Sequence, residues 1–117
     1  MDQKQAEAIA TDWVAAWNAH DLEKILSHYA DPLEFTSPLV IERFGRADGT
    51  IRTKAELREY FAIGVAPDSV VHFELIDVLP GVSSVTLYYR NHRGRTVAET
   101  MFIDEKGFIF KAAVHYR

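Results

Sequence analysis

The first pattern along the chain is an apolar residue at every fourth position. Ile9, Trp13 and Trp17 are separated by four residues each, and small apolar residues stand beside them. One apolar residue per turn is typical of a helix with a single buried face. Asn18-Ala19-His20 interrupts this spacing, so we expect the helix to end there.

A second, shorter helix is predicted directly afterwards. Asp21 can act as its N-cap, because a carboxylate accepts hydrogen bonds from the free amides of a first helical turn. The apolar residues that follow have the i, i+3, i+4, i+7 spacing of a helix face: Leu22, Ile25, Leu26 and Tyr29. Asp31-Pro32 is expected to end this helix, since the residue before a proline avoids helical backbone.

A third helix is predicted near the middle of the chain. Thr53 and Glu56 have the spacing of a capping box, in which a hydroxyl and a carboxylate each bind an amide of the first turn. The predicted inner face of this helix contains Leu57, Tyr60, Phe61 and Gly64. Pro67 lies just beyond its end.

After Pro67 the apolar residues alternate with polar ones, which predicts strands. Four strands are expected, with turns between them: residues 70–79, 82–92, 96–104 and 108–116. Helices come first and antiparallel strands afterwards. The predicted class is therefore α+β, with the helices on one face of a curled sheet.

The turn at Arg93-Gly94 decides the register of the long hairpin. As a two-residue turn it would place Tyr88 opposite Glu99, and directly opposed residues share a face of a sheet. One face would then contain Thr86, Tyr88, Arg90, Val97, Glu99 and Met101, and the other Leu87, Tyr89, Ala98, Thr100 and Phe102. Both sets include large apolar side chains. We therefore expect the helices to cover one face and a second copy of the chain, in a homodimer, to cover the other.

Composition narrows the classes of protein that need to be considered. A chain of 117 residues forms one domain, expected to span residues 1–117, and it has no cysteine for disulfides or thiolate chemistry. A net charge of −4 with interspersed signs gives no reason to expect nucleic acid as a partner. The apolar runs are too short to span a membrane and the N-terminus lacks signal-peptide features, so we expect a cytoplasmic protein with no membrane partner.

The histidines do not form a metal-binding motif. No His-x-x-His or His-Glu-x-x-His pair occurs among the five: His20, His28, His72, His92 and His115. Phosphate loops and nucleotide fingerprints are also absent, so we expect neither a metal nor a cofactor. If Val114 and Tyr116 point inward, alternation directs His115 to the outer face, where the dimer interface is expected.

Three stretches of the chain resemble a known superfamily: "WVAAWNAHDLEKILSHYADPLEFTSP", "RTKAELREYFAIG" and "GFIFKAAVHY". From about Ala6 to Tyr116 the chain is similar to nuclear transport factor 2-like proteins, and especially to their SnoaL-like and ketosteroid-isomerase-like branch. This resemblance implies a cone in which three helices pack in the concave face of a curved, mixed but mainly antiparallel sheet, around an apolar cavity. Residues 41–52 are then expected to be an irregular segment that controls the mouth of the cone.

The resemblance implies several activities and singles out none. Relatives isomerise steroids, cyclise polyketides, dehydrate substrates or open epoxides, and others only bind ligands or form dimerisation modules. Compared with the ketosteroid isomerases, Trp13 stands in place of the oxyanion-hole tyrosine, Ser37 replaces the catalytic aspartate, and Glu99 keeps an acidic group. Without a carboxylate at Ser37 the base of that reaction is missing, which argues against steroid isomerase activity.

Glu99 is the first candidate for chemistry. In an apolar interior its pKa would rise, so that it could act as an acid, a base or a hydrogen-bond donor. Tyr88 and Arg90, which the predicted register places beside it, are the other candidate catalytic residues. Two alternatives stay open: Arg90 could hold Glu99 in a structural ion pair, and Tyr88 could be a core residue with a satisfied hydroxyl.

A further set of residues is predicted to bind a ligand in the cavity: Trp13, Trp17, Tyr29, Phe35, Ser37, Tyr60, Phe61, Met101 and Tyr116. The two tryptophans could fill the core or form a flat wall for a ring-shaped molecule. Three functions stay open. The chain could be a domain that binds a small apolar molecule, an isomerase, cyclase or lyase that uses Glu99, or a dimeric protein-interaction module.

Overall fold

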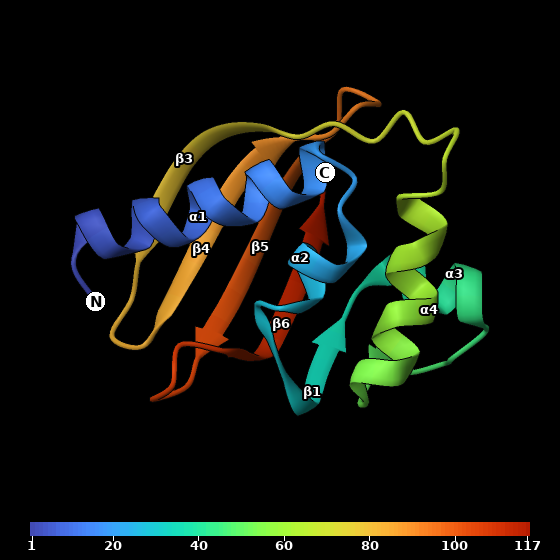
Figure 1. Ribbon diagram of the computed structural model, residues 1–117, viewed down its shortest axis with the longest axis horizontal. Helices are drawn as coiled ribbons and strands as arrows, with labels where there is room; N and C mark the ends of the chain where they lie inside the picture. Colours follow the sequence, from blue (N-terminus) through green and yellow to red (C-terminus); the bar gives the residue numbers. More distant parts are fainter.

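The computed structural model describes all residues, 1–117, and contains four helices and six strands (Figure 1). The helices are α1 (Gln3–Asn18), α2 (Leu22–Leu26), α3 (Pro38–Phe44) and α4 (Lys54–Gly64). The strands are β1 (Tyr29–Thr36), β2 (Thr50–Ile51), β3 (Glu74–Pro80), β4 (Ser84–Arg90), β5 (Thr96–Ile103) and β6 (Ile109–Tyr116). No helix is long and apolar enough to cross a membrane.

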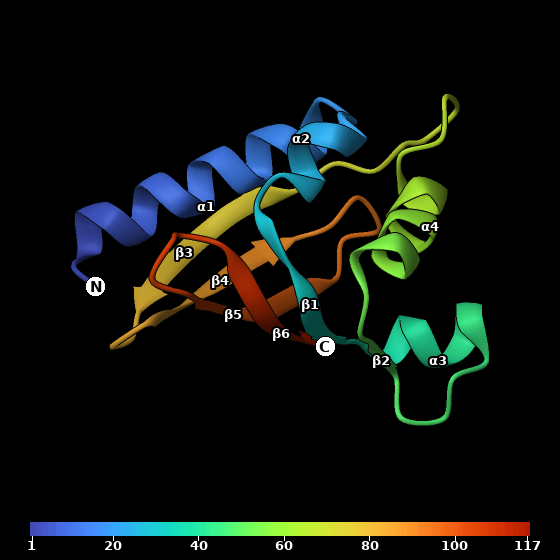
Figure 2. The same ribbon diagram turned by 60° about the horizontal axis from the view of Figure 1, so that its bottom comes forward.

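All six strands belong to one curved sheet, in the order β2-β1-β6-β5-β4-β3. β1 and β6 are parallel, whereas every other neighbouring pair is antiparallel. α1 and α2 lie on one side of this sheet, and α4 stands beside them (Figure 2). The predicted α+β class, with a mixed and mainly antiparallel sheet, is confirmed. The helices number four rather than the three that were predicted.

α1 packs against β3 through a face made largely of alanine. Its buried residues are Ala6, Ala10, Trp13, Ala16 and Trp17. Asp2 caps the helix and forms a complete capping box with Gln5, so the amides of the first turn have partners. The small alanine side chains allow a close approach to the sheet, and the two tryptophans fill the interior beside them.

Two polar residues at the end of α1 hold the segment that precedes β3. Asn18 donates from Nδ2 to the Phe73 carbonyl at 2.9 Å and accepts the Phe73 amide at 2.8 Å. His20 has a φ of 55°, and its Nε2 lies 2.7 Å from the Val71 carbonyl. These contacts occupy backbone groups that a strand would use. The strand predicted from residue 70 accordingly begins only at Glu74.

The second helix is shorter than predicted. Its N-cap is Asp21, as expected, but it ends at Leu26. Tyr29 opens β1 instead of closing the helix, and Asp31-Pro32 lies within that strand. The prediction that Asp31-Pro32 ends the helix is therefore wrong. Alternate residues of β1 such as Phe35 are buried in the sheet, and this tertiary packing overrides the helical spacing.

Residues 41–52 are not irregular, which corrects a second prediction. They contain the end of α3 and all of β2. Ser37 caps α3 by accepting the Leu39 amide at 3.3 Å, and Pro38 occupies the first turn, where its missing amide costs nothing. Gly45, with a φ of 62°, ends the helix in the left-handed conformation that favours glycine.

α4 confirms the third predicted helix. Leu57, Tyr60 and Phe61 are buried on its inner face. The Thr53 hydroxyl accepts the Glu56 amide at 3.2 Å, as the capping box requires. The Glu56 carboxylate, however, forms an ion pair with Arg46, so only half of the predicted box is present.

The β4–β5 hairpin has a three-residue loop rather than the predicted two-residue turn. The Asn91 amide donates to the Arg95 carbonyl at 2.9 Å, and the Asn91 side chain accepts two loop amides at 3.0 Å. The extra residue shifts the register by one, so Glu99 lies opposite Leu87 and not opposite Tyr88. A shift of one residue moves every side chain of a strand to the other face.

The two faces of the hairpin therefore differ from the prediction along β4 only. The inner, buried face contains Val85, Leu87, Tyr89, Val97, Glu99 and Met101. The outer face contains Thr86, Tyr88, Arg90, Ala98, Thr100 and Phe102, none of which is fully buried. Thr86, Tyr88 and Arg90 were predicted inside and lie outside, whereas Leu87 and Tyr89 were predicted outside and lie inside.

Candidate functional site

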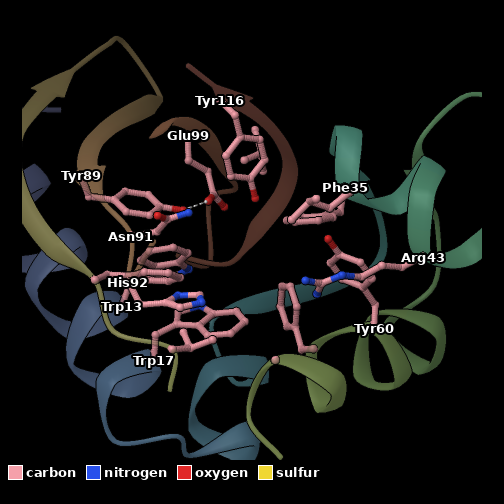
Figure 3. A pocket seen from close by; sticks show the side chains of 16 residues that line it. Trp13, Trp17, Phe35, Arg43, Tyr60, Tyr89, Asn91, His92, Glu99 and Tyr116 are labelled. Atoms are coloured by element: carbon pink, nitrogen blue, oxygen red, sulfur yellow. Dashed lines mark hydrogen bonds between the residues drawn. The ribbon is translucent and has the colours of Figure 1, made fainter. Parts of the chain in front are cut away.

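A cavity of about 100 Å³ lies between the inner face of the sheet and the helices (Figure 3). α1 contributes Trp13 and Trp17, and α4 contributes Tyr60, Phe61 and Gly64. The strands contribute Phe35, Tyr89, Glu99, Val114 and Tyr116. Most of this wall is aromatic or aliphatic. Its only residues of formal charge are Glu99 and Arg43.

Glu99 is a carboxyl group in an apolar interior. The residue is 3% exposed, and its neighbours along the inner face of β5 are Val97 and Met101. Burial raises the pKa of Glu99 from 4.5 to about 7, because a charged carboxylate loses its hydration there. The carboxyl points into the cavity (Figure 3). At neutral pH both its protonated and its ionised form are therefore populated.

One oxygen of Glu99 has a partner and the other has none. The Tyr89 hydroxyl donates to Oε1 at 2.9 Å, whereas Oε2 is buried without any hydrogen bond. The hydrogen bond from Tyr89 favours the ionised form and so opposes part of the effect of burial on the pKa. A buried oxygen without a partner is costly, so a ligand atom that reached Oε2 would relieve this cost.

The structure corrects the two residues predicted to accompany Glu99. Tyr88 is 37% exposed on the outer face, and Arg90 is exposed beside it, because of the register shift described above. Tyr89 occupies the place that was assigned to Tyr88. The three ion pairs of the structure are Arg46–Glu56, Arg52–Asp48 and Arg58–Glu23, so Arg90 does not neutralise Glu99.

The two tryptophans have different roles in the wall. Trp13 is 2% exposed, and its Nε1 donates to the Tyr29 hydroxyl at 3.1 Å. It stacks on Phe73, with the ring centroids 5.6 Å apart. Trp17 is also buried, but its Nε1 has no hydrogen-bond partner. The cavity wall thus has one unused donor, on Trp17, and one unused acceptor, on Glu99.

Six of the nine predicted ligand-binding residues line the cavity: Trp13, Trp17, Phe35, Tyr60, Phe61 and Tyr116. The other three do not. Tyr29 is buried behind Trp13, and Met101 is fully buried within the sheet. Ser37 is 1% exposed and is used as the cap of α3.

Several lining residues were not predicted. Val71 and Phe73 belong to the segment that Asn18 and His20 hold in place, and their role depends on those tertiary contacts. Leu39 and Arg43 come from α3, which Ser37-Pro38 and Gly45 could have indicated in the sequence. The remaining unpredicted lining residues are Gly64 on α4, Tyr89 on β4, Asn91 and His92 at the hairpin loop, and Val114 on β6.

Two tyrosines and the histidine of the wall are neutral at physiological pH. Burial raises the pKa of Tyr60 to about 12 and also raises the pKa of Tyr116. Loss of hydration, with the positive charges of Arg93 and Arg43, lowers the pKa of His92. No group of three or more His, Asp or Glu residues could hold a metal ion. Glu99 is therefore the group of this wall whose protonation changes near neutral pH.

The fold is similar to that of NTF2-like proteins. An NTF2-like protein of unknown function from Cytophaga hutchinsonii aligns over 96% of this chain and 89% of its own, with a TM-score of 0.74 and 10% sequence identity. The epoxide hydrolase/cyclase-like enzyme SalBIII, described for pyran ring formation in the polyether salinomycin, aligns over 99% and 93% with a TM-score of 0.76 and 16% identity. At these identities the likeness concerns the fold.

A narrower assignment follows from two further comparisons. The family model of the SnoaL-like domain matches residues 10–117. A SnoaL-like protein of unknown function from Burkholderia thailandensis shares 39% identity, over 99% of this chain and 97% of its own, with a TM-score of 0.91. The chain belongs to the SnoaL-like family. No curated protein matches it significantly.

Proposed function

We propose that the protein binds a compact, mainly apolar small molecule in this cavity and exchanges a proton with it through Glu99. The observation that carries the proposal is the Glu99 carboxyl itself. It is buried, faces the cavity, has a pKa of about 7, and keeps Oε2 free of any protein partner. A catalytic acid or base works best when its pKa lies near the working pH.

The size of the cavity supports a ligand of about one ring. Its volume is about 100 Å³, below the roughly 150 Å³ of an apolar cavity that binds benzene, so a ligand of one ring would extend from the cavity to its mouth. Aromatic walls such as Trp17 and Phe61, whose rings meet edge to face with centroids 4.9 Å apart, suit the face or edge of a flat molecule. A four-ring steroid is too large for this space, in agreement with the missing base at Ser37.

A ring ketone illustrates the chemistry that the site supports. The ionised Glu99 carboxylate would take a proton from the carbon next to the carbonyl, and the electron pair of that C–H bond would form the C=C bond of an enolate. The Trp17 Nε1–H, which has no partner, is available to donate to the developing oxyanion. Exchange of the Glu99 proton with solvent and protonation of the same carbon complete the exchange, and in a β,γ-unsaturated ring ketone protonation of the γ-carbon is an isomerisation.

Deuterium exchange tests this proposal. Cyclohexanone is incubated with the protein in D₂O, and the loss of its α-proton signal is followed by NMR. We expect exchange to be faster with the wild type than with Glu99→Gln by about 10²–10⁴-fold, since a positioned base contributes about that factor. The substitution keeps the shape of the side chain and its contact with Tyr89.

Glu59→Gln is the matched control, because Glu59 is exposed on α4 and does not line the cavity. It should exchange cyclohexanone at the wild-type rate. Equal rates for the wild type and Glu99→Gln would remove proton transfer from the proposal. A saturable change in tryptophan fluorescence on adding cyclohexanone would then support the second candidate function, a domain that binds without catalysis, which the serine at position 37 favours.

We also propose that two copies of the chain associate through the outer face of the sheet. Phe108, Phe110 and Tyr88 expose 39%, 43% and 37% of their surface, and Phe102 packs on Phe110 with ring centroids 6.4 Å apart. His115 also lies on this face, with Nδ1 3.1 Å from the Ala98 carbonyl. Large apolar side chains on an open sheet face are typical of a covered surface.

Sedimentation velocity of Phe110→Glu tests the dimer. A charge at the centre of an apolar interface should convert a dimeric wild type to monomer. Val82→Glu is the control, because Val82 is 93% exposed in the turn between β3 and β4. A monomeric wild type at micromolar concentration, or identical behaviour of both variants, would contradict the proposed interface.

A further inference from the structure

Arg43 is a cation at the edge of the cavity that has no ion-pair partner in the protein. It projects from α3, it is exposed, and it takes part in none of the three ion pairs. Its guanidinium carbon lies 5.9 Å from the centroid of the Tyr60 ring, on the wall of the cavity. Figure 3 shows the side chain pointing from α3 toward the space between the labelled residues.

The charge of Arg43 acts on one end of the cavity. It contributes to the lowered pKa of His92 and it opposes the raised pKa values of Tyr60 and Tyr116. Its charge does not contribute to the shifted pKa of Glu99, which arises from burial and from Tyr89. Arg43 and Glu99 also form no ion pair with each other. The cavity has an anionic or neutral polar group in its depth and a free cation at its mouth.

We propose that the ligand of this cavity is a compact ring that carries one carboxylate, which Arg43 binds at the mouth while the ring lies between the aromatic walls. A guanidinium and a carboxylate form paired, charge-assisted hydrogen bonds, which gives the contact direction as well as strength. This inference rests on the proposed function and deepens it, because it names the chemical class of the ligand and a residue that positions it.

The charge balance favours one negative charge over two. His92 shares the wall with Arg43, and its lowered pKa, to which the charge of Arg43 contributes, keeps it neutral at physiological pH. Arg93 belongs to the hairpin loop but does not line the cavity. A carboxylate would thus be matched by one guanidinium, whereas the second charge of a phosphate monoester would have no partner.

The same charges fix the orientation of the ligand. A carboxylate turned toward Glu99 would meet a second carboxyl group in an apolar interior, where two negative charges cannot both persist. With the carboxylate at Arg43, the opposite side of the ring faces Glu99 and Tyr89. Arg43 is accordingly a positioning residue, and Glu99 is the group that exchanges the proton.

Paired ligands of the same shape test the inference. Benzoate and its neutral analogue benzamide are titrated near pH 7 into the wild type and into Arg43→Gln, with tryptophan fluorescence or calorimetry as the readout. We expect Arg43→Gln to weaken benzoate by about tenfold or more, as for a lost charge-assisted hydrogen bond, and to leave benzamide within about twofold. Arg43→Lys should restore part of the benzoate affinity, because it keeps the charge but loses the planar fork.

Two controls distinguish direct contact between Arg43 and the ligand carboxylate from the general electrostatic field of the protein. Arg93→Gln removes a neighbouring positive charge that does not line the cavity, so it should change benzoate affinity by less than about twofold at physiological salt. Glu99→Gln should leave the preference for benzoate over benzamide unchanged. A preference that rises strongly in Glu99→Gln would put the carboxylate at the inner end and would overturn the assignment to Arg43.

The remaining outcomes are also decisive. The same ratio of benzoate to benzamide affinity in the wild type and in Arg43→Gln would overturn the inference, as would equal losses in Arg43→Gln and Arg93→Gln. If benzamide binds and benzoate does not bind more tightly, the ligand does not need a carboxylate. The inference is then refuted and the proposed function stays intact. If neither compound binds at millimolar concentration, the inference fails, and the deuterium exchange of cyclohexanone decides the proposed function separately. Loss of deuterium exchange alone would concern Glu99 and not Arg43.

Discussion

Replacing Trp13 by alanine is expected to lower the free energy of unfolding by about 3–5 kcal/mol, which is typical of a large aromatic side chain removed from a core. Trp13 is 2% exposed and contacts three aromatic neighbours, Trp17, Phe73 and Tyr89. Its loss would leave a void beside the existing cavity. It would also leave the Tyr29 hydroxyl, which accepts from Trp13 Nε1, buried without a partner.

Urea unfolding of two variants, Trp13→Phe and Trp17→Phe, distinguishes the free-energy cost of the void from the cost of the lost hydrogen bond. Trp13→Phe keeps much of the packing but removes the donor to Tyr29, whereas Trp17→Phe removes a donor that has no partner. We expect Trp13→Phe to cost about 1–2 kcal/mol more than Trp17→Phe, since an unsatisfied buried group carries a penalty of that order. If Trp17→Phe proved the more costly, Trp17 and not Trp13 would be the structural tryptophan of this core.

The second large effect is a pH-dependent gain in stability on replacing Glu99 by glutamine. The pKa of Glu99 is about 7 in the folded protein and 4.5 in an ordinary environment, so the folded state binds the proton more tightly than the unfolded state. The contribution of Glu99 to stability is thus complete below about pH 4.5 and is lost as the pH rises toward 7 and above. The loss amounts to about 3 kcal/mol.

Glutamine stays neutral at every pH and avoids this loss. Glu99→Gln should therefore unfold at a higher urea concentration than the wild type at about pH 8, by up to about 3 kcal/mol, and the two should converge near pH 4.5. Glu59→Gln, on the exposed face of α4, should follow the wild type throughout. A stability difference that does not vary with pH would mean that Glu99 is already neutralised by an unrecognised partner.

The parts of the fold that the sequence predicts well are those fixed by local spacing. The stripe of Ile9, Trp13 and Trp17 and the cap at Thr53 gave α1 and α4 directly, because amphipathic spacing and capping act within one helix. The alternation of Val97, Glu99 and Met101 likewise put the Glu99 carboxyl on the inner face of β5. Each of these features depends only on neighbours within a few residues.

The errors arose where the outcome depends on contacts between distant segments. A loop of three residues instead of two moved Tyr89, and not Tyr88, beside Glu99. The alternation of Val85, Leu87 and Tyr89 with more polar residues was already a sign of this register. Phe73 could not be predicted at the cavity, because its position depends on two hydrogen bonds between its backbone and the Asn18 side chain, one in each direction.

The position of β6 has a consequence for how the protein is made. β6 is flanked by β1 and β5, and Tyr29 of β1 is paired with Ile109, a residue eighty positions later in the chain. On the ribosome, β1 emerges long before β6. Until β6 is made, the apolar side chains of β1 stay in contact with water or with a chaperone. Folding is thereby governed by pairings distant in sequence, which are slow to form. The cavity, whose wall includes Val114 and Tyr116 of β6, can form only once this strand has been synthesised.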